Sequence, residues 1–281
     1  AIAAMWWLLR HLDAPVERLL LYAWHPLPIW EIAGSGHLDA VALAFLMLAF
    51  CAKARGRGFA AGAALGAAAL VKFLPVVTLP ALWRRGDWRL PLALVLTVAA
   101  LYAIYIGPVG AEVFGFLGGY AGEEQLASGA GFYLWSLALA LWQWMGGSSP
   151  MALGALPYLI IALGILAWLA LRAISTEENL DAALGAGAVL VSALLVLLSP
   201  HYPWYFLLVV PFFCFRPYPP MLWLTTTSFL LYALDWPAPG DTHRLLVESL
   251  MYGGCFALAL GLWWRERRER REGVAHDAGA A

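Results

Sequence analysis

Long apolar runs separated by short polar breaks dominate this sequence. A helix that crosses a bilayer needs about 20 apolar residues, and only helices and closed barrels satisfy their backbone polar groups there. The chain is 63% hydrophobic and 12% charged, whereas soluble domains carry about 25% charged residues. The apolar runs lie roughly at 1–9, 15–30, 38–52, 58–71, 73–83, 90–106, 150–171, 180–198, 204–215, 218–234 and 245–264. They predict an all-α, polytopic transmembrane bundle of about ten spans or partial spans.

The distribution of Lys and Arg predicts how the chain threads the membrane, because these residues mark cytoplasmic loops. The stretch LGAAALVKFLPVVTLPALWRR (65–85) is compatible with one long helix or with a hairpin that turns at Lys72–Pro75. The hairpin places 15 of the 17 Lys and Arg on one side and leaves Lys72 and Arg244 outside, whereas the single helix places 12. We therefore predict the hairpin.

Two domains follow from this threading: a membrane-embedded domain at 1–264 and a basic cytoplasmic tail at 265–281. The long external loop 107–149 contains FYLWSLALALWQWMGG (132–147), an aromatic piece typical of an interfacial or re-entrant helix. The sequence opens AIAAMWWLLR without an initiator Met. We expect the first span and the first external loop to precede Ala1.

Three ionisable residues crowd the break PIWEIAGSGHLDA (28–40), namely Glu31, His37 and Asp39. Asp39 stands where a helix begins, so it is a candidate helix cap. Capping does not explain the other two, and a carboxylate at the edge of hydrocarbon is costly unless it is paired or wetted. The cluster indicates a polar cavity in which Asp39 or Glu31 could take a proton from a hydroxyl nucleophile.

Two further features lie on the predicted outer face. Lys72 stands inside an apolar run, where it either snorkels to the interface or binds an anion such as phosphate. In LLSPHYPWYFLLVVPF (197–212), two prolines flank His201 and Tyr202 and would present them at the outer rim, and Trp204 and Tyr205 follow. These aromatic residues suit either an interfacial belt or a groove for a lipid phosphate.

Several function classes find no support in the sequence. There is no GxSxG, P-loop or HExxH motif, and the three cysteines lie in apolar segments without CxxC spacing. The basic residues are dispersed between apolar runs, so we expect no nucleic-acid partner. We predict no metal site and no cofactor, although a divalent cation would be compatible with the acids.

Three motifs, in order along the chain, resemble bacterial membrane mannosyltransferases of the C-type glycosyltransferase fold, glycosyltransferase family 87. The motifs are LLLYAWHPLPIWEIAGSGHLDAVALAFLMLAF (19–50), AGAALGAAALVKFLP (61–75) and LLSPHYPWYFLLVVPF (197–212). The resemblance implies an integral-membrane enzyme that takes a hexose, mannose in our prediction, from a polyprenyl-phosphate carrier. It would transfer the sugar to a hydroxyl of a glycan, lipid or protein, with inversion at the anomeric carbon.

The resemblance also implies roles for individual residues. Asp39 matches the acid of the second external loop, with His37 beside it. Lys72 matches the hairpin lysine, although Phe73 stands where the family has proline. The segment with His201, Trp204 and Tyr205 matches the region near the lipid phosphate. The family's main catalytic acid lies in the first external loop, which we expect before Ala1, so Asp39 would be an accessory acid.

The expected location is the bacterial inner (plasma) membrane, with the active site facing the periplasm or exterior. Two alternatives remain at this point. A transporter or lipid flippase also combines broken helices with a buried lysine, and would show substrate movement without sugar transfer. A non-catalytic subunit of a glycosyltransferase complex would be needed only for a partner enzyme's activity.

Overall fold

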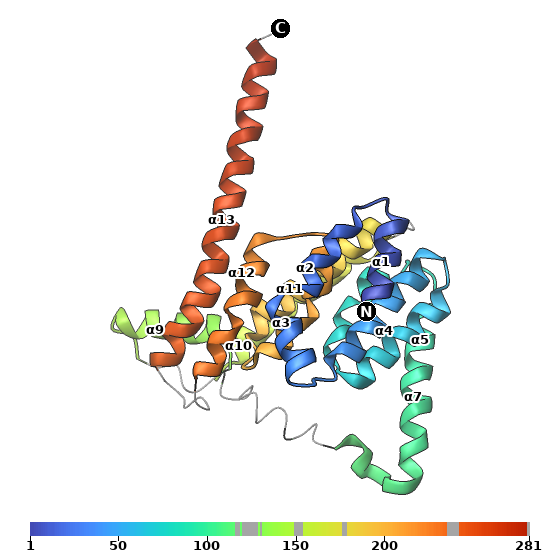
Figure 1. Cartoon of the computed structure of the whole chain (residues 1–281). Helices are drawn as coiled ribbons and strands as arrows, with labels where there is room; N and C mark the ends of the chain where they lie inside the picture. Colours follow the sequence, from blue (N-terminus) through green and yellow to red (C-terminus); the bar gives the residue numbers. More distant parts are fainter. Residues whose placement is uncertain are drawn as a thin grey trace.

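Every regular element of the described residues is a helix. The computed structural model describes residues 1–115, 119, 129, 131–148, 154–175, 179–234 and 242–279 (Figure 1). The α-helices are α1 (Ile2–His11), α2 (Leu20–Ala23), α3 (Pro26–Pro28), α4 (Asp39–Ala54), α5 (Gly58–Val71), α6 (Leu79–Leu82), α7 (Arg89–Val109), α9 (Tyr133–Trp144), α10 (Leu156–Ala173), α11 (Leu180–Leu198), α12 (Pro219–Thr227) and α13 (Thr242–Gly279). The tighter or wider turns are η1 (Val16–Leu19), η2 (Ile29–Gly34), η3 (Leu74–Thr78), η4 (Gly110–Phe114), η5 (Pro203–Leu208), η6 (Val210–Cys214) and η7 (Ser228–Ala233).

Four helices of the described residues are long and apolar enough to cross a membrane: α7, α10, α11 and α13. The apolar window of α11 is 44% buried, whereas the windows of α7 and α10 are each 6% buried. Helix α11 is therefore central, and α7 and α10 present their apolar side chains to lipid. The prediction of an all-α polytopic helical membrane protein is confirmed.

Glycines allow α5 and α7 to pack in close contact. A Cβ atom on Gly62 would lie 2.0 Å from the carbonyl oxygen of Leu90, and one on Gly66 would lie 3.0 Å from that of Leu94. Spacing small residues four apart lets two helix backbones approach in this way. The GxxxG pattern in α5 therefore packs this helix closely against α7.

The chain turns back after α5, as the hairpin prediction requires. Lys72 ends α5 in an extended conformation, and η3 and α6 follow. The carbonyl oxygen of Leu82, at the end of α6, accepts a hydrogen bond from Nζ of Lys53 at 3.0 Å. Since Lys53 lies at the end of α4, the chain has returned to the end where α5 began.

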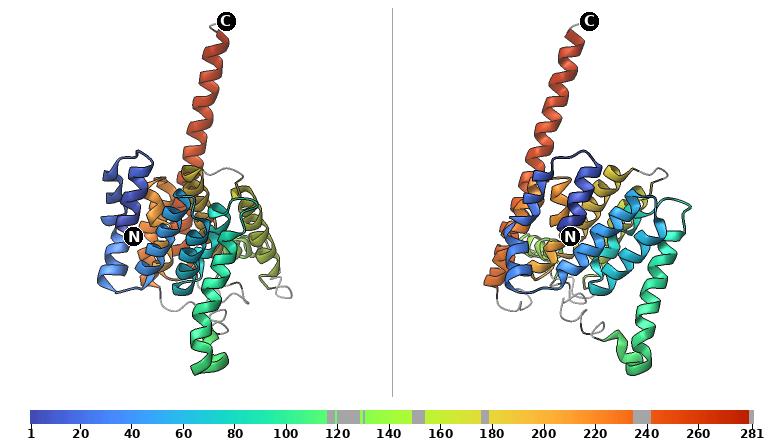
Figure 2. Two further views of the ribbon diagram at one scale, coloured as in Figure 1. Left: turned by 90° about the vertical axis from the view of Figure 1, so that its right-hand side faces the viewer. Right: turned by 45° about the vertical axis from the view of Figure 1, so that its right-hand side comes forward.

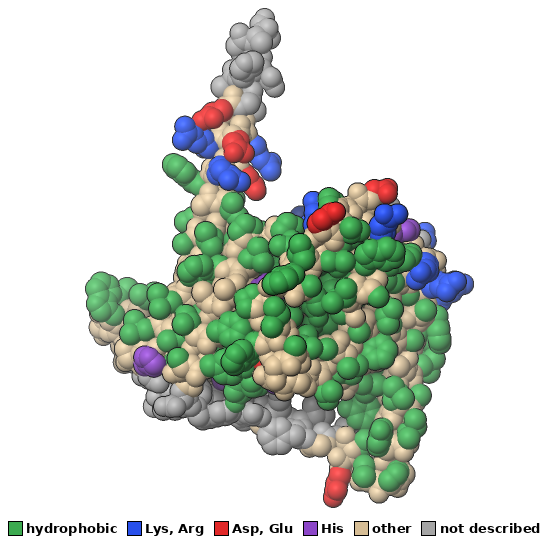
Figure 3. Space-filling model, in the orientation of Figure 1, with side chains coloured by type: hydrophobic (Ala, Val, Ile, Leu, Met, Phe, Trp, Pro, Cys, Tyr) green, Lys and Arg blue, Asp and Glu red, His purple; other side chains and the backbone are tan. Residues whose placement is uncertain are grey.

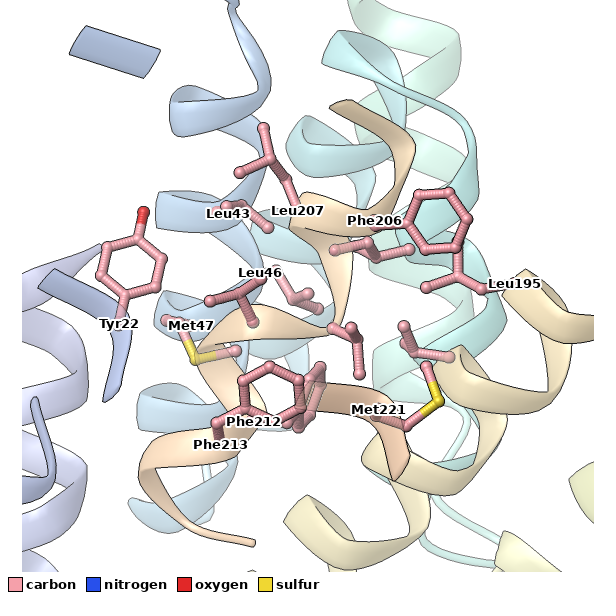
Figure 4. Close-up of a cluster of buried hydrophobic side chains, with 14 of the residues drawn as sticks. Tyr22, Leu43, Leu46, Met47, Leu195, Phe206, Leu207, Phe212, Phe213 and Met221 are labelled. Carbon is pink, nitrogen blue, oxygen red and sulfur yellow. The ribbon is translucent and has the colours of Figure 1, made fainter. Parts of the chain in front are cut away.

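The segment η5–η6 forms the centre of the hydrophobic core. Figure 4 shows Phe206, Leu207 and Phe212 of this segment between side chains of α4 and α11. Pro203 and Pro211 stand in the first turn of each piece, where a proline needs no hydrogen-bond partner for its nitrogen. The chain thus enters the middle of the bundle in two short turns instead of one spanning helix.

The ends of the molecule differ in charge. Helix α13 projects from one end of the bundle and α7 from the other (Figure 2). On the face drawn in Figure 3, Lys and Arg side chains lie at the end from which α13 projects. Helix α13 continues through residue 265 without a break, so the predicted tail at 265–281 is helical up to Gly279.

The stretch predicted to form an interfacial or re-entrant helix contains α9. Its 12 residues span about 18 Å, which is too short to cross the hydrocarbon core. In Figure 1, α9 runs across the direction of α13. The remainder of loop 107–149 lies partly outside the described residues.

Candidate active site

The acid cluster lies in an irregular turn that precedes α4. Residues Ile29–Gly34 form a π-helical turn, a rare form that is frequent at functional sites. Gly36 then adopts a φ of +72°, a conformation in which glycine carries no steric penalty. The N–H of His37 donates to the carbonyl oxygen of Glu31 at 2.9 Å. This short loop closure brings Glu31, His37 and Asp39 together.

The imidazole of His37 lies between the two carboxylates. Its Nε2 is 3.4 Å from Oε2 of Glu31, and its Nδ1 is 4.0 Å from Oδ2 of Asp39. The side chain of Glu31 is completely buried, whereas that of Asp39 is 12% exposed and that of His37 is 29% exposed. Asp39 and His37 are therefore the accessible members of the cluster, and Glu31 is the buried one.

Lys72 pairs with Asp39. Its Nζ donates a hydrogen bond to Oδ1 of Asp39 at 2.6 Å, which is short even for a charge-assisted bond. Residue Leu38 occupies the N-cap position of α4, and no side chain caps this helix end. The expectation that Asp39 caps α4 is therefore wrong: its carboxylate bonds to the hairpin lysine instead. Lys72 was expected to bind an anion such as phosphate; in the structure, the anion that it binds is the carboxylate of Asp39.

Aromatic rings cover one side of the cluster. The ring of His37 stacks on Trp204 with centroids 4.6 Å apart, and Trp204 stacks on Tyr202 at 4.3 Å and 9°. The ammonium of Lys72 lies 4.2 Å from the centroid of Tyr205, within the range of cation–π attraction. The structure thus places Trp204 against His37 and Tyr205 against Lys72, with Tyr202 stacked on Trp204.

Tyr232 is a member of the site that the sequence analysis missed. Its hydroxyl donates to Oε1 of Glu31 at 2.7 Å, across 201 residues of sequence. It stands in η7 within an apolar, aromatic segment, so no local pattern distinguishes it from an interfacial tyrosine. With this bond and the contact to His37, both oxygens of Glu31 face polar groups of the protein.

His201 belongs to a second, more deeply buried group. It lies in the turn between α11 and η5, outside the spanning helices, and is 9% exposed. Burial, together with the nearby positive charge of Arg244, lowers the pKa of His201 to about 4. The imidazole is therefore neutral at pH 7. The prediction that His201 stands at an exposed rim is wrong, because the side chain is directed into the protein.

Arg244 is the second residue that the sequence analysis did not select. Its Nε donates to Oε1 of Glu248 at 2.9 Å, and the side chain is 7% exposed. Within the described residues, the buried Nη1 and Nη2 atoms have no hydrogen-bond partner. A buried guanidinium with unpaired nitrogens is costly. The sequence did contain a signal for Arg244: in the predicted threading, Arg244 and Lys72 are the two basic residues left on the external side.

Metal ligation has no obvious centre in the part of the chain that the structure describes. In that part, no group of three or more His, Cys, Asp or Glu side chains is placed to hold a metal ion.

Broken helices that bring acids, a lysine and stacked aromatic rings together define a polytopic membrane protein with a polar site at the edge of its bundle. The family model of glycosyltransferase family 87 matches residues 1–200, which is more than half of the chain. The chain therefore belongs to glycosyltransferase family 87 and is a membrane glycosyltransferase. The match includes Asp39 and Lys72 and ends just before His201. None of the curated proteins and none of the solved structures compared with the chain matches it.

Proposed function

We propose that this glycosyltransferase moves a hexose, mannose in the first instance, from a polyprenyl-phosphate donor to a hydroxyl acceptor. The observation that carries the proposal is the partly exposed carboxylate of Asp39, held by Lys72 beside the aromatic stack. The family membership supports glycosyl transfer. The apolar surface of the bundle supports a lipid-linked donor, because such a donor is delivered within the membrane.

In the proposed step, the acceptor oxygen attacks the anomeric carbon of the donor sugar. The carboxylate of Asp39 accepts the proton of that hydroxyl as the new carbon–oxygen bond forms. The bond between the anomeric carbon and the phosphate oxygen breaks, and polyprenyl phosphate leaves with the electron pair. Direct displacement inverts the anomeric configuration. Asp39 is the acid that the described residues offer for this proton transfer.

Lys72 and the buried acid have positioning roles in this proposal. The hydrogen bond from Lys72 holds one oxygen of Asp39 and leaves the other, Oδ2, facing His37 at 4.0 Å. Glu31 is too deeply buried to touch a substrate. Its Oε1 accepts a hydrogen bond from Tyr232, and its Oε2 contacts and orients His37. We therefore assign Glu31 to positioning and not to proton transfer.

The leaving phosphate needs donors that stabilise its developing charge. Lys72 already donates a hydrogen bond to Asp39, so it has little remaining capacity to stabilise the phosphate charge. Arg244 offers two guanidinium nitrogens without partners among the described residues, and a guanidinium matches phosphate geometry through paired hydrogen bonds. We propose that Arg244 binds the donor phosphate, with neutral His201 nearby as a further hydrogen-bonding group.

The proposed location is the bacterial inner membrane, with the site on the external side and the C-terminus in the cytoplasm. The gathering of basic side chains at the end from which α13 projects supports this orientation. The acid cluster precedes α4, whereas Lys53 and Arg55 stand at the end of α4. A 16-residue helix therefore separates the cluster from these basic residues, by about 24 Å.

The test is a transfer assay in proteoliposomes made with the protein expressed from its complete gene. Polyprenyl-phosphate mannose, polyprenyl-phosphate glucose and a nucleotide-linked mannose are offered with membrane glycan and glycolipid acceptors. We expect labelled sugar to reach an acceptor from the polyprenyl-phosphate donor and not from the nucleotide sugar. Movement of the donor lipid across the bilayer without transfer would favour a transporter. Transfer that appears only when a second enzyme is added would favour a non-catalytic subunit.

A further inference from the structure

A large apolar cavity lies apart from the acid cluster. Its volume is about 940 Å³, near the upper end of the range of about 300–1,000 Å³ found for ligand pockets. The side chains around it come from α11, the segment after η5, α12 and α13, and include Phe212, Phe213, Met221, Cys255 and Phe256 (the first three are labelled in Figure 4).

Helix α11 supplies one wall of the cavity along most of its length. One of its faces packs into the core through Leu184, Val191 and Leu195. The other face lines the cavity at positions from Ala182 to Val196, a distance of about 21 Å along the helix axis. Most side chains on this face are small, including Ala182, Gly185, Ala186, Ser192 and Ala193. The wall is therefore a long, shallow slot.

The slot is open to the surrounding lipid. Val189, which lines it, is 52% exposed, and Phe256 on the facing helix is 40% exposed. In a bilayer such side chains contact hydrocarbon. An acyl chain can therefore enter the slot from the side, between two helices.

Two arginines stand at one end of the slot. Arg216 pairs with Asp181 at the start of α11, and it lies beside Gly185, where an added Cβ would be 3.6 Å from Nε of Arg216. Arg18 also lines the cavity, and within the described residues no carboxylate pairs with it. The mouth therefore carries two positive charges and one negative charge.

We propose that this cavity binds an anionic phospholipid, with its phosphate between Arg18 and Arg216 and one acyl chain along α11. Basic pockets between transmembrane helices on the cytoplasmic side bind lipid head groups in this manner. The charge surplus at the mouth matches one phosphodiester. The tail of the donor is the competing occupant, but Arg216 pairs with Asp181 at the N-terminal end of α11, whereas the segment that contacts His37 and Lys72 follows its C-terminal end. The inference does not depend on the proposed sugar transfer.

The experiment measures which lipid remains with the protein. The complete protein is reconstituted in vesicles of phosphatidylcholine, with or without phosphatidylglycerol and with polyprenyl phosphate as competitor. The protein is then extracted in a mild detergent, and the mass of the protein with its bound lipid is measured by native mass spectrometry. We expect one phosphatidylglycerol per protein. Arg18→Gln and Arg216→Gln should each reduce its retention by about tenfold, as expected for the loss of a charge-assisted contact. Two cavity-filling changes, Ala186→Leu and Ala193→Leu, should abolish retention.

Matched controls lie outside the cavity. Arg172→Gln removes a basic side chain that stacks on Trp168, and Gly164→Leu adds a side chain where no atom lies within 4 Å of the new Cβ. Both should retain phosphatidylglycerol like the wild type, and so should Asp39→Asn even where sugar transfer is lost. Equal retention of phosphatidylcholine, full retention in the arginine and cavity-filled variants, or displacement by polyprenyl phosphate would each overturn the proposal.

Discussion

The ammonium nitrogen of Lys72 lies 2.6 Å from Oδ1 of Asp39, although 33 residues separate them along the chain. This contact ties the tip of the α5–η3 hairpin to the first turn of α4. It joins two residues that the sequence analysis had assigned to different tasks, proton transfer and phosphate binding. The pair is instead one unit, in which the lysine holds the carboxylate that faces the site.

The Asp39–Lys72 pair should behave as coupled residues. Removing the cation alone in Lys72→Met leaves a mostly buried carboxylate unpaired, so we expect a loss of about 2 kcal/mol of unfolding free energy, between the values for exposed and buried pairs. Thermal unfolding of Lys72→Met, Asp39→Asn and the double variant measures the coupling. The double variant should be no less stable than Lys72→Met. Losses that simply add would show that the two side chains do not interact.

Arg244 should affect the donor more than the acceptor. Arg244→Lys keeps the charge but loses the paired geometry of the guanidinium. We expect its kcat/KM for the polyprenyl-phosphate donor to fall by about tenfold or more, the value of one lost charge-assisted contact, with the acceptor KM unchanged.

A double change separates phosphate binding from folding. Arg244→Met combined with Glu248→Gln removes both members of the buried pair, so no charge is left alone. This protein should remain folded by thermal unfolding and should lose the stabilisation that the donor confers on the wild type. Donor-induced stabilisation equal to that of the wild type would exclude Arg244 from the phosphate site.

His201 should make stability depend on pH. Because its folded-state pKa is about 4 against an ordinary value of 6.5, the unfolded chain binds more protons between these values. The contribution of His201 to the free energy of unfolding is therefore fully present above pH 6.5, and it is lost as the pH falls toward 4. His201→Gln should flatten the decline in unfolding temperature over this window. His11→Gln, a change at an exposed side chain, is the control and should leave the decline unaltered.

Gly62 should be required for the α5–α7 contact. A methyl group at this position would meet the carbonyl oxygen of Leu90 at 2.0 Å, so Gly62→Ala forces the two backbones apart. We expect a loss of about 1–3 kcal/mol in unfolding free energy. Gly164→Ala on α10, where a Cβ meets no atom within 4 Å, should be neutral or slightly stabilising. Equal stability of the two variants would contradict the close packing.

Much of the fold can be predicted from the sequence, because the lengths of the apolar segments and the distribution of Lys and Arg are strong signals. They predict the helical class, the turn after Lys72 and the short helix α9. The residues of the predicted tail extend α13 from residue 265 to Gly279, since charged residues with high helix propensity continue the helix. The change from apolar to charged residues indicates where the chain leaves the membrane, but it does not indicate where the helix ends.

The site was predictable in part. Glu31, His37 and Asp39 were visible because charges are rare in apolar sequence, and the PWY segment was visible through its prolines. Tyr232 was not, because its bond to Glu31 crosses 201 residues and its neighbours are ordinary apolar residues. The inward direction of His201 also could not be read locally, since it depends on how α11 ends against α13. Long-range partners, and not residue types, were the missing information.

The most direct test of the account is sugar transfer by Asp39→Asn, measured together with donor binding in the same proteoliposomes. Asparagine keeps the shape and the contact with Lys72 but cannot accept the proton. We predict that donor binding stays near the wild-type value, while kcat falls by about 10²–10⁴, the usual contribution of a general base. Transfer at the wild-type rate would contradict the central claim, and would leave Asp39 as a structural partner of the hairpin lysine.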